Sequence, residues 1–255
     1  MIIERIEVDS RVFGRNVLAI LDFDPAANFS ACEREYIDEF DPAYVSSKVP
    51  LDRVSDIHAL ERSGFNFIEC QIRAAMKLRK PYDVSQFPYD FDQVTREEDL
   101  QHVLQIAGST FLHDRFRVDP SVASQISGAR YREYVRKSFH SPDEAVYCLR
   151  ERASGRVVAF KTHRYVGSTE VLFLLGGVHP ELKNAGLGLI SEYFEFNTLI
   201  GKGIRRGITH ISASNHSIFN LEIGRVGFRV LGTFAVMRKV YPTGVATLGT
   251  ATQRK

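Results

Sequence analysis

The sequence predicts an α/β protein built on a mixed sheet. Short apolar runs typical of strands alternate with longer amphipathic segments typical of helices along most of the chain. The run over residues 171–178 is apolar on both faces, as expected for a central strand. It leads through a turn containing Gly186 and Gly188 into a segment of helical character over residues 187–200. We expect the rest of the fold to be arranged around this order of strand, turn and helix.

Length and composition limit the classes of protein. The chain has 255 residues, 44% of them hydrophobic, which is enough for a substantial core, and its formal net charge is only +2. It has no block of Lys or Arg, so we expect no nucleic-acid partner. Cys32, Cys70 and Cys148 lack metal-ligand spacing, which predicts reduced thiols in a cytoplasmic protein and no metal. No apolar stretch is long enough for a bilayer, and no signal peptide is recognised, so no membrane partner is expected.

The first third of the chain predicts a separate α/β unit. Short strands are expected over residues 2–8, 17–23 and 44–48. A helix is expected from Ser55 to a stop at Gly64, followed by a strand over residues 65–76. The predicted organisation is an N-terminal unit over residues 1–80, a proline-containing linker over 81–90, a second domain over 91–241 and a flexible tail over 242–255.

The second domain has clear boundary signals. After a short strand over residues 91–94, Thr95 and Glu98 match a capping box that starts a helix. Asp119 and Pro120 match the start of a second helix. The expected order continues with a hairpin over 145–165, the central strand over 171–178, the helix over 187–200, a strand over 208–213, a helix over 215–225 and a strand pair over 228–241.

The turn after the central strand is a candidate anion site. A helix N-terminus gathers backbone N–H groups at the positive end of the helix dipole. Gly186 and Gly188 would let that backbone approach an anion closely, because glycine has no Cβ. Glycines at a strand–helix junction can also serve the turn alone, and that alternative remains open.

This turn resembles the acetyl-CoA pyrophosphate loop of the GNAT N-acetyltransferase superfamily. The loop of that family has Arg or Gln, two residues, Gly, one residue, and Gly or Ala, after a Val-His-Pro-Glu lead-in that is present here over residues 178–181. Lys183 takes the first position, a departure that keeps the positive charge. The resemblance implies a GNAT fold and acetyl-CoA as cosubstrate. It implies cofactor contacts from Gly177, Val178, Lys183, Asn184, Ala185, Gly186, Leu187, Gly188, Asn215 and Asn220.

Further short motifs resemble GNAT enzymes that acetylate nucleotide-linked amino sugars. They are Phe13-Gly14, Arg115-Phe116 and the extra N-terminal unit. The resemblance implies a small-molecule amine acceptor, a nucleotide sugar with Arg115 and Phe116 in its site, and a homodimer as the candidate oligomer. An ion pair of Arg115 with Asp114 or Asp119 is the alternative.

A weak internal likeness concerns the two glycines that follow helix ends. The sequence around Gly64 resembles that around Gly227. The first third is therefore predicted to be a partial copy of a GNAT half, although such junctions are also common in unrelated proteins.

The proton donor is the least certain assignment from the resemblance. Many GNAT enzymes carry a tyrosine four residues before the Gly-Phe that follows the last helix, and that position is Ile223 here. Glu222, in a different helical register, and His216 are therefore the candidate catalytic residues. Asn215 is either a CoA ligand or a helix N-cap. We also expect a β-bulge at Gly176 and Gly177, where the backbone would approach pantetheine.

The base and the acceptor remain open at the level of sequence. His113, Asp114, Glu170 or a water chain to solvent would suffice to receive the proton of the amine. The leading function is N-acetylation of a nucleotide-linked amino sugar. The alternatives are a GNAT enzyme acting on an amino acid, a polyamine or a protein amine, and a catalytically degenerate protein that binds acyl-CoA.

Overall fold

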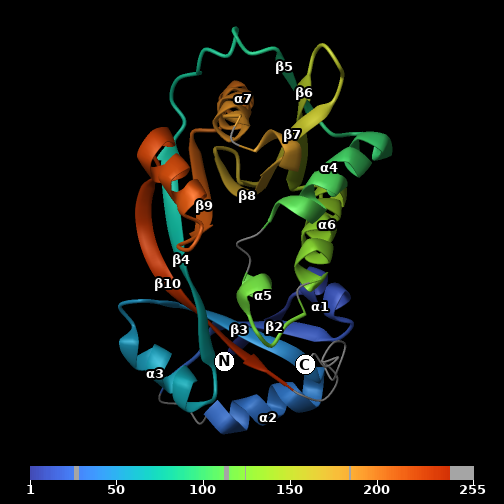
Figure 1. The fold of residues 1–255 in the computed structure, drawn as a ribbon. Helices are drawn as coiled ribbons and strands as arrows, with labels where there is room; N and C mark the ends of the chain where they lie inside the picture. Colours follow the sequence, from blue (N-terminus) through green and yellow to red (C-terminus); the bar gives the residue numbers. More distant parts are fainter. Residues whose placement is uncertain (26–28, 112–114, 124, 184, 242–255) are drawn as a thin grey trace, which may run out of the picture. The chain divides into compact units, whose positions relative to one another are not determined.

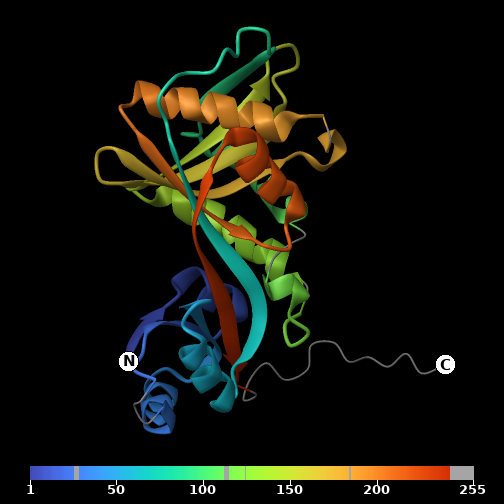
Figure 2. The same cartoon turned by 90° about the vertical axis from the view of Figure 1, so that its left-hand side faces the viewer.

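The computed structural model describes residues 1–25, 29–111, 115–123, 125–183 and 185–241 (Figures 1 and 2). The chain forms two compact units. Unit 1 comprises Met1–Gln71, His113–Ser127 and Thr233–Lys255, and unit 2 comprises Ile72–Leu112 and Gly128–Gly232. The hydrogen-bonded order of the ten strands is β1-β2-β3-β10-β4-β9-β8-β7-β6-β5, and β4 and β10 contribute to both units.

Unit 1 consists of a small mixed sheet and the helices that pack with it. They are β1 (Ile2–Arg5), α1 (Glu7–Phe13), β2 (Asn16–Asp22), α2 (Phe29–Phe40), β3 (Pro42–Pro50), α3 (Val54–Arg62), α5 (Arg115–Val118) and parts of β4 (Asn66–Lys77) and β10 (Arg229–Val240). β2 is parallel to β3, whereas β1 and β10 are antiparallel to their neighbours β2 and β3. Leu18, Tyr36, Val45, Leu60 and Met237 are fully or almost fully buried in its core.

Unit 2 contains the predicted central strand and helix. Its elements are β5 (Tyr89–Gln93), α4 (Glu97–Thr110), most of α6 (Gln125–His140), β6 (Glu144–Glu151), β7 (Val157–Val166), β8 (Glu170–Val178), η1 (Pro180–Leu182), α7 (Leu187–Gly201), β9 (Arg206–Ser212), α8 (His216–Phe219) and η2 (Asn220–Val226). β5 to β8 form an antiparallel meander, and β9 is parallel to β8.

The meander of unit 2 carries a hydrophobic core on each face. Cys148 and Phe160 pack with α4 and α6, whereas their chain neighbours Leu149 and Ala159 pack with α7. This alternation follows from the two-residue period of a strand. Figure 1 shows α7 and the pair α4 and α6 on either side of the meander. The sheet therefore separates two layers of helices, and the charged groups described below lie on the α7 side.

Several local predictions for the first unit are wrong. The strand over residues 2–8 ends at Arg5, because α1 begins at Glu7 and continues to Gly14, which has φ 68°. Helix α2 was not predicted; it ends at Phe40, and Asp41 with φ 42° then turns the chain.

In the rest of the chain, two helix starts and the last strand also differ from the prediction. α4 starts after Arg96 with no side-chain cap, so the capping box at Thr95 is not formed. α6 starts at Gln125 and not at Asp119, whose carboxylate is instead engaged by Arg238. The expected strand pair over residues 228–241 is the single strand β10.

The two compact units are defined by spatial contacts, and each consists of segments that are separated in the sequence. The predicted domains over residues 1–80 and 91–241, with a linker over 81–90, are continuous in the sequence, and these boundaries stay a prediction. The tail over residues 242–255 lies outside the described residues.

Candidate functional site

The strands β8 and β9 part from each other in the middle of the sheet. Their parallel pairing covers Glu170, Val171 and Leu172, opposite Arg206, Gly207 and Ile208, and ends there within the described residues. On its other edge β8 remains paired with β7 as far as Val178. The backbone from Phe173 to Val178 therefore has one edge without a strand partner. An extended ligand can pair with such an edge as an added strand would.

A β-bulge occurs in β8, but not where we expected it. The register shifts between Thr162 and His163, whose partners are Leu175 and Phe173, so the extra residue is Leu174. Gly176 and Gly177 are paired regularly with Lys161 and Phe160, and the prediction of a bulge at these glycines is wrong. Their role is steric, because a Cβ on Gly177 would lie 2.6 Å from the ring of Phe160.

The turn from β8 into α7 is exposed. η1 is capped by His179, which accepts a hydrogen bond from the Glu181 N–H, and the N–H of Ala185 donates to Leu182 O at 3.3 Å. Gly186 then has φ 75° and precedes the first helical residue, Leu187.

The first turn of α7 supplies donors at this place. The intrahelical ladder begins with Ile190 N–H donating to Gly186 O at 3.1 Å, so the amides of the preceding helical residues have no acceptor within the helix. Lys183, Ala185 and Gly186 are exposed, and Asn184 lies outside the described residues. The turn thus combines exposed backbone, a helix N-terminus and a lysine.

The helix after β9 differs from the expected regular α-helix. Its first turn, α8, is capped by Asn215, whose side chain accepts from the Ile218 N–H at 3.2 Å. The plain N-cap interpretation of Asn215 therefore describes its contact in this structure. His216 and Asn220 are exposed.

From Asn220 the helix continues as the π-helix η2. Wider turns of this kind shift which side chains face inward, and they are frequent at functional sites. Here the carbonyl of Glu222 accepts from the amides of Gly227 and Phe228 at 3.0 and 2.9 Å. The side chain of Glu222 is buried, with 7% exposure, while Ile223 packs beside α7. The π-helix therefore provides the different helical register in which Glu222 can replace the tyrosine of many GNAT enzymes.

Glu222 lies in a group of buried charges on the α7 side of the sheet. Lys161 from β7 forms an ion pair with Glu192 from α7. Two residues further along β7, His163 Nδ1 lies 2.8 Å from Glu195 Oε1, and both side chains are essentially inaccessible. Glu222 Oε2 and His163 Nε2 are buried without a hydrogen-bond partner among the described residues. We call Lys161, His163, Glu192, Glu195 and Glu222 the charged cluster.

The charged cluster contains more carboxyl groups than it can neutralise. Burial and then the charge of Glu192 raise the pKa of Glu222 to about 9, with Lys161 acting in the opposite direction. Burial likewise raises the pKa of Glu192. Burial disfavours the ammonium of Lys161, but the three carboxyl groups around it raise its pKa. At neutral pH, Glu222 is therefore a protonated carboxylic acid.

Four members of the charged cluster were missed by sequence reasoning. Lys161 and His163 sit two residues apart in an apolar strand, so they share one face, and Glu192 and Glu195 share one face of a mostly apolar helix. Charged residues at such positions are unusual in a core. That pattern could have identified the residues, but not their pairing.

The residues predicted to bind the acceptor lie in unit 1. Phe116 is fully buried between the rings of Phe13 and Tyr44, with centroid distances of 5.3 and 5.1 Å, so it has no surface with which to contact a substrate. Arg115 lies 3.6 Å from the buried carboxylate of Asp9. Of its two predicted partners, Asp119 is engaged by Arg238, and Asp114 lies outside the described residues. These two residues contribute to the interior of unit 1 in this structure.

The described residues also bear on metal binding and on membrane insertion. They contain no group of three or more His, Cys, Asp or Glu side chains that could hold a metal ion. None of their helices is both long and apolar enough to cross a membrane.

The chain is similar to known acetyltransferases in both sequence and fold. No family model matches the chain. Among curated proteins, dTDP-fucosamine acetyltransferase of Escherichia coli is 23% identical over 168 residues, which are 66% of this chain and 70% of that protein.

Solved structures give a broader likeness. A GCN5-related N-acetyltransferase from Sphaerobacter thermophilus has a TM-score of 0.66 at 14% identity, over 93% of this chain and 76% of that one. A second one from Kribbella flavida has a TM-score of 0.59 at 15% identity, over 88% and 81%. A tandem GNAT protein of the clavulanic acid pathway has a TM-score of 0.57 at 15% identity, over 83% and 68%.

These likenesses confirm the predicted fold class. The mixed sheet with its helices corresponds to that of GNAT proteins, among which tandem ones occur. The curated relative is an acetyltransferase, in agreement with the predicted class of enzyme. The protein described here has the fold of the GNAT N-acetyltransferases.

Proposed function

We propose that this protein is an acetyl-CoA-dependent N-acetyltransferase that acts on a small amine. One observation carries the proposal: β8 loses its β9 partner after Leu172, and its open edge leads directly to the exposed glycine turn that begins α7. An extended pantetheine chain fits the open edge as an added strand. The diphosphate at its end fits a helix N-terminus.

The cofactor contacts divide between these two places. Gly177 and Val178 belong to the open edge, and Thr110 supports it by donating to Val178 O at 3.2 Å. The amides of Gly186, Leu187 and Gly188 are proposed to hold the diphosphate, with Lys183 adding a positive charge. Asn184, Ala185, Asn215 and Asn220 stay predictions as further contacts.

Glu222 is proposed as the proton donor. The amine nitrogen attacks the thioester carbonyl carbon, the C–S bond breaks, and the sulfur leaves with the electron pair. Protonated Glu222 gives its proton to that sulfur, and its carboxylate then takes the proton released by the new amide nitrogen. Atoms and charge balance, and Glu222 returns to its starting state. Its pKa near 9 keeps the acid form available at neutral pH. His216 is exposed and stays the alternative.

A nucleotide-linked amino sugar is the proposed acceptor. The support is the curated relative from Escherichia coli, which is named for such a substrate. The alternatives are an amino acid, a polyamine or a protein amine as the acceptor, and binding of acyl-CoA without turnover. Only Ile223 favours binding without turnover. Thiol release from acetyl-CoA in the presence of dTDP-linked 4-amino-4,6-dideoxy sugars, amino acids and polyamines decides among them. A homodimer and a cytoplasmic location stay predictions.

The variant Gly186→Asp tests the cofactor turn. It places a carboxylate where the diphosphate is proposed to bind, so calorimetry should show CoA affinity reduced by at least about tenfold. Gly167→Asp is the matched control: Gly167 has φ 70° against 75° for Gly186, and a Cβ at either position meets no atom within 4 Å. Both variants bear the same backbone strain, and only the first should lose CoA. Equal CoA affinity in the two variants would contradict the proposed diphosphate site at this turn.

A further inference from the structure

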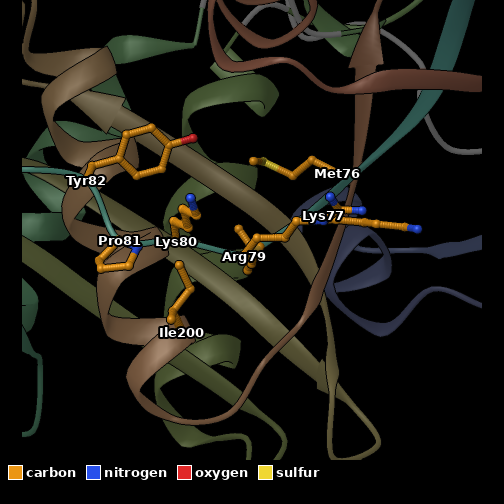
Figure 3. A pocket seen from close by; sticks show the side chains of 8 residues that line it. Met76, Lys77, Arg79, Lys80, Pro81, Tyr82 and Ile200 are labelled. Carbon is orange, nitrogen blue, oxygen red and sulfur yellow. The ribbon is translucent and has the colours of Figure 1, made fainter.

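A hollow lies at the C-terminal end of α7, the end away from the glycine turn. It has a volume of about 330 Å³ and is formed by the end of β4, the residues that follow it and the last turn of α7. Its apolar lining comes from Met76, Leu78, Tyr82 and Ile200. Figure 3 shows Tyr82 and Ile200 on one side of this hollow and Met76 on the other. The volume is at the lower end of the range for small-molecule pockets.

The wall of this hollow is held in place. Tyr82 N–H donates to Asn197 Oδ1 at 2.7 Å, and Asn197 Nδ2 donates to Tyr82 O at 2.9 Å. The ring of Tyr82 is stacked on that of Tyr193, with centroids 4.3 Å apart and an angle of 11°. At the other end Leu78 N–H donates to Arg205 O at 2.9 Å. A pocket with fixed walls loses little entropy when it binds.

Three cations stand around the apolar lining. Lys77, Arg79 and Lys80 line the hollow, and all three are exposed. None of them has an ion-pair partner within 4 Å among the described residues, in contrast to Lys161. The nearest acid in sequence, Asp83, is occupied by Ser85, whose N–H and Oγ both donate to it. The hollow therefore combines an apolar floor with three cations that form no ion pair with a carboxylate in the part of the chain that the structure describes.

We propose that this hollow binds a nucleoside phosphate. The base would lie against the apolar lining and Tyr82, and the phosphates would contact Arg79 and the two lysines. A guanidinium suits phosphate because its planar fork can donate two parallel hydrogen bonds. The site is separate from the cofactor turn: a helix rises about 1.5 Å per residue, so Leu187 and Ile200 lie roughly 20 Å apart along α7.

The double variant Arg79→Gln/Lys80→Gln tests this site. We expect thymidine diphosphate to bind the wild-type protein in calorimetry, and about tenfold more weakly after the double change. Arg73→Gln/Arg229→Gln removes the same charge from exposed residues of unit 2 outside the lining, and should bind as the wild type does. Thymidine and pyrophosphate alone should each bind more weakly than thymidine diphosphate. Absence of binding to the wild type at millimolar concentration, or an equal loss in both double variants, overturns the site.

The test is independent of the proposed acetyl transfer. Gly186→Asp should leave the affinity for thymidine diphosphate unchanged, and loss of that affinity would place the ligand at the cofactor turn and overturn the second site. If the bound nucleotide is part of the acceptor, Arg79→Gln/Lys80→Gln should raise the KM for the nucleotide-linked amine about tenfold and leave kcat unchanged. A separate nucleotide would leave that KM unchanged. Both outcomes keep the site and differ only in the source of its ligand.

Discussion

A buried ion pair of unit 1 and the charged cluster of unit 2 are built differently. In unit 1, Arg238 donates to both carboxylate oxygens of Asp119 at 2.7 and 2.8 Å, and Ser121 accepts a further bond from the same guanidinium at 3.1 Å. Each carboxylate oxygen of Asp119 has a partner. In unit 2, one lysine faces three carboxyl groups, and Glu222 Oε2 has no partner among the described residues.

This difference distinguishes an ion pair that stabilises the structure from a charged cluster that is a candidate for catalysis. A balanced pair with good geometry keeps both groups charged and fixes the segments that carry them. An unbalanced group must change protonation, because buried like charges cannot all be ionised cheaply. Burial and then the charge of Glu192 raise the pKa of Glu222 to about 9, whereas the bond to Asp119 raises the pKa of Arg238, whose guanidinium stays charged. Unusual pKa values of the first kind are concentrated at functional sites.

The largest effect is expected from Glu222→Gln. Loss of the proton donor should lower kcat for acetyl transfer by about 10²- to 10⁴-fold, with CoA affinity retained. Thiol release gives kcat, and calorimetry gives the affinity. His216→Ala is the comparison, because His216 is exposed and outside the charged cluster. Full activity of Glu222→Gln would show that the imbalance in unit 2 has no role in catalysis.

A smaller effect, on stability alone, is expected from Asp119→Ala. It leaves the guanidinium of Arg238 buried without its partner, which should cost about 3 kcal/mol of unfolding free energy in urea. The double variant Asp119→Leu/Arg238→Met removes both charges and should recover most of that loss. The pair would not be structural if Asp119→Ala cost less than about 1 kcal/mol.

The smallest effect concerns the pH dependence of stability. The folded protein holds the Glu222 proton up to about pH 9, whereas the unfolded chain releases it near pH 4.5, so between these values folding binds a proton. The stability of the wild type should therefore fall as pH rises through this window, relative to Glu222→Gln, which cannot titrate. Relative to the wild type, the variant should gain about 1.4 kcal/mol of unfolding free energy between pH 6 and pH 7. The exposed Glu61→Gln serves as control, and parallel pH curves for wild type and Glu222→Gln would contradict the raised pKa.

Local sequence signals determined the frame of the candidate site. The apolar run and the glycine turn predicted β8 and the start of α7 to within a residue, because a continuous apolar run and a glycine junction are features of residues adjacent in the chain. The same is true of the hairpin β6–β7 and of the stop at Gly64.

Only the tertiary structure determined which side chains come together in the site. The bulge at Leu174 depends on the register between β7 and β8, and the partner of Lys161 comes from a helix far along the chain. Glu222 is buried because residues 220–226 form a π-helix, and the apolar residues of that π-helix pack with Phe196 and Leu199 of α7. Asp119 shows the same limit, since its sequence matches a helix cap and a distant arginine engages it instead. These outcomes depend on residues distant in sequence, so no local pattern contains them.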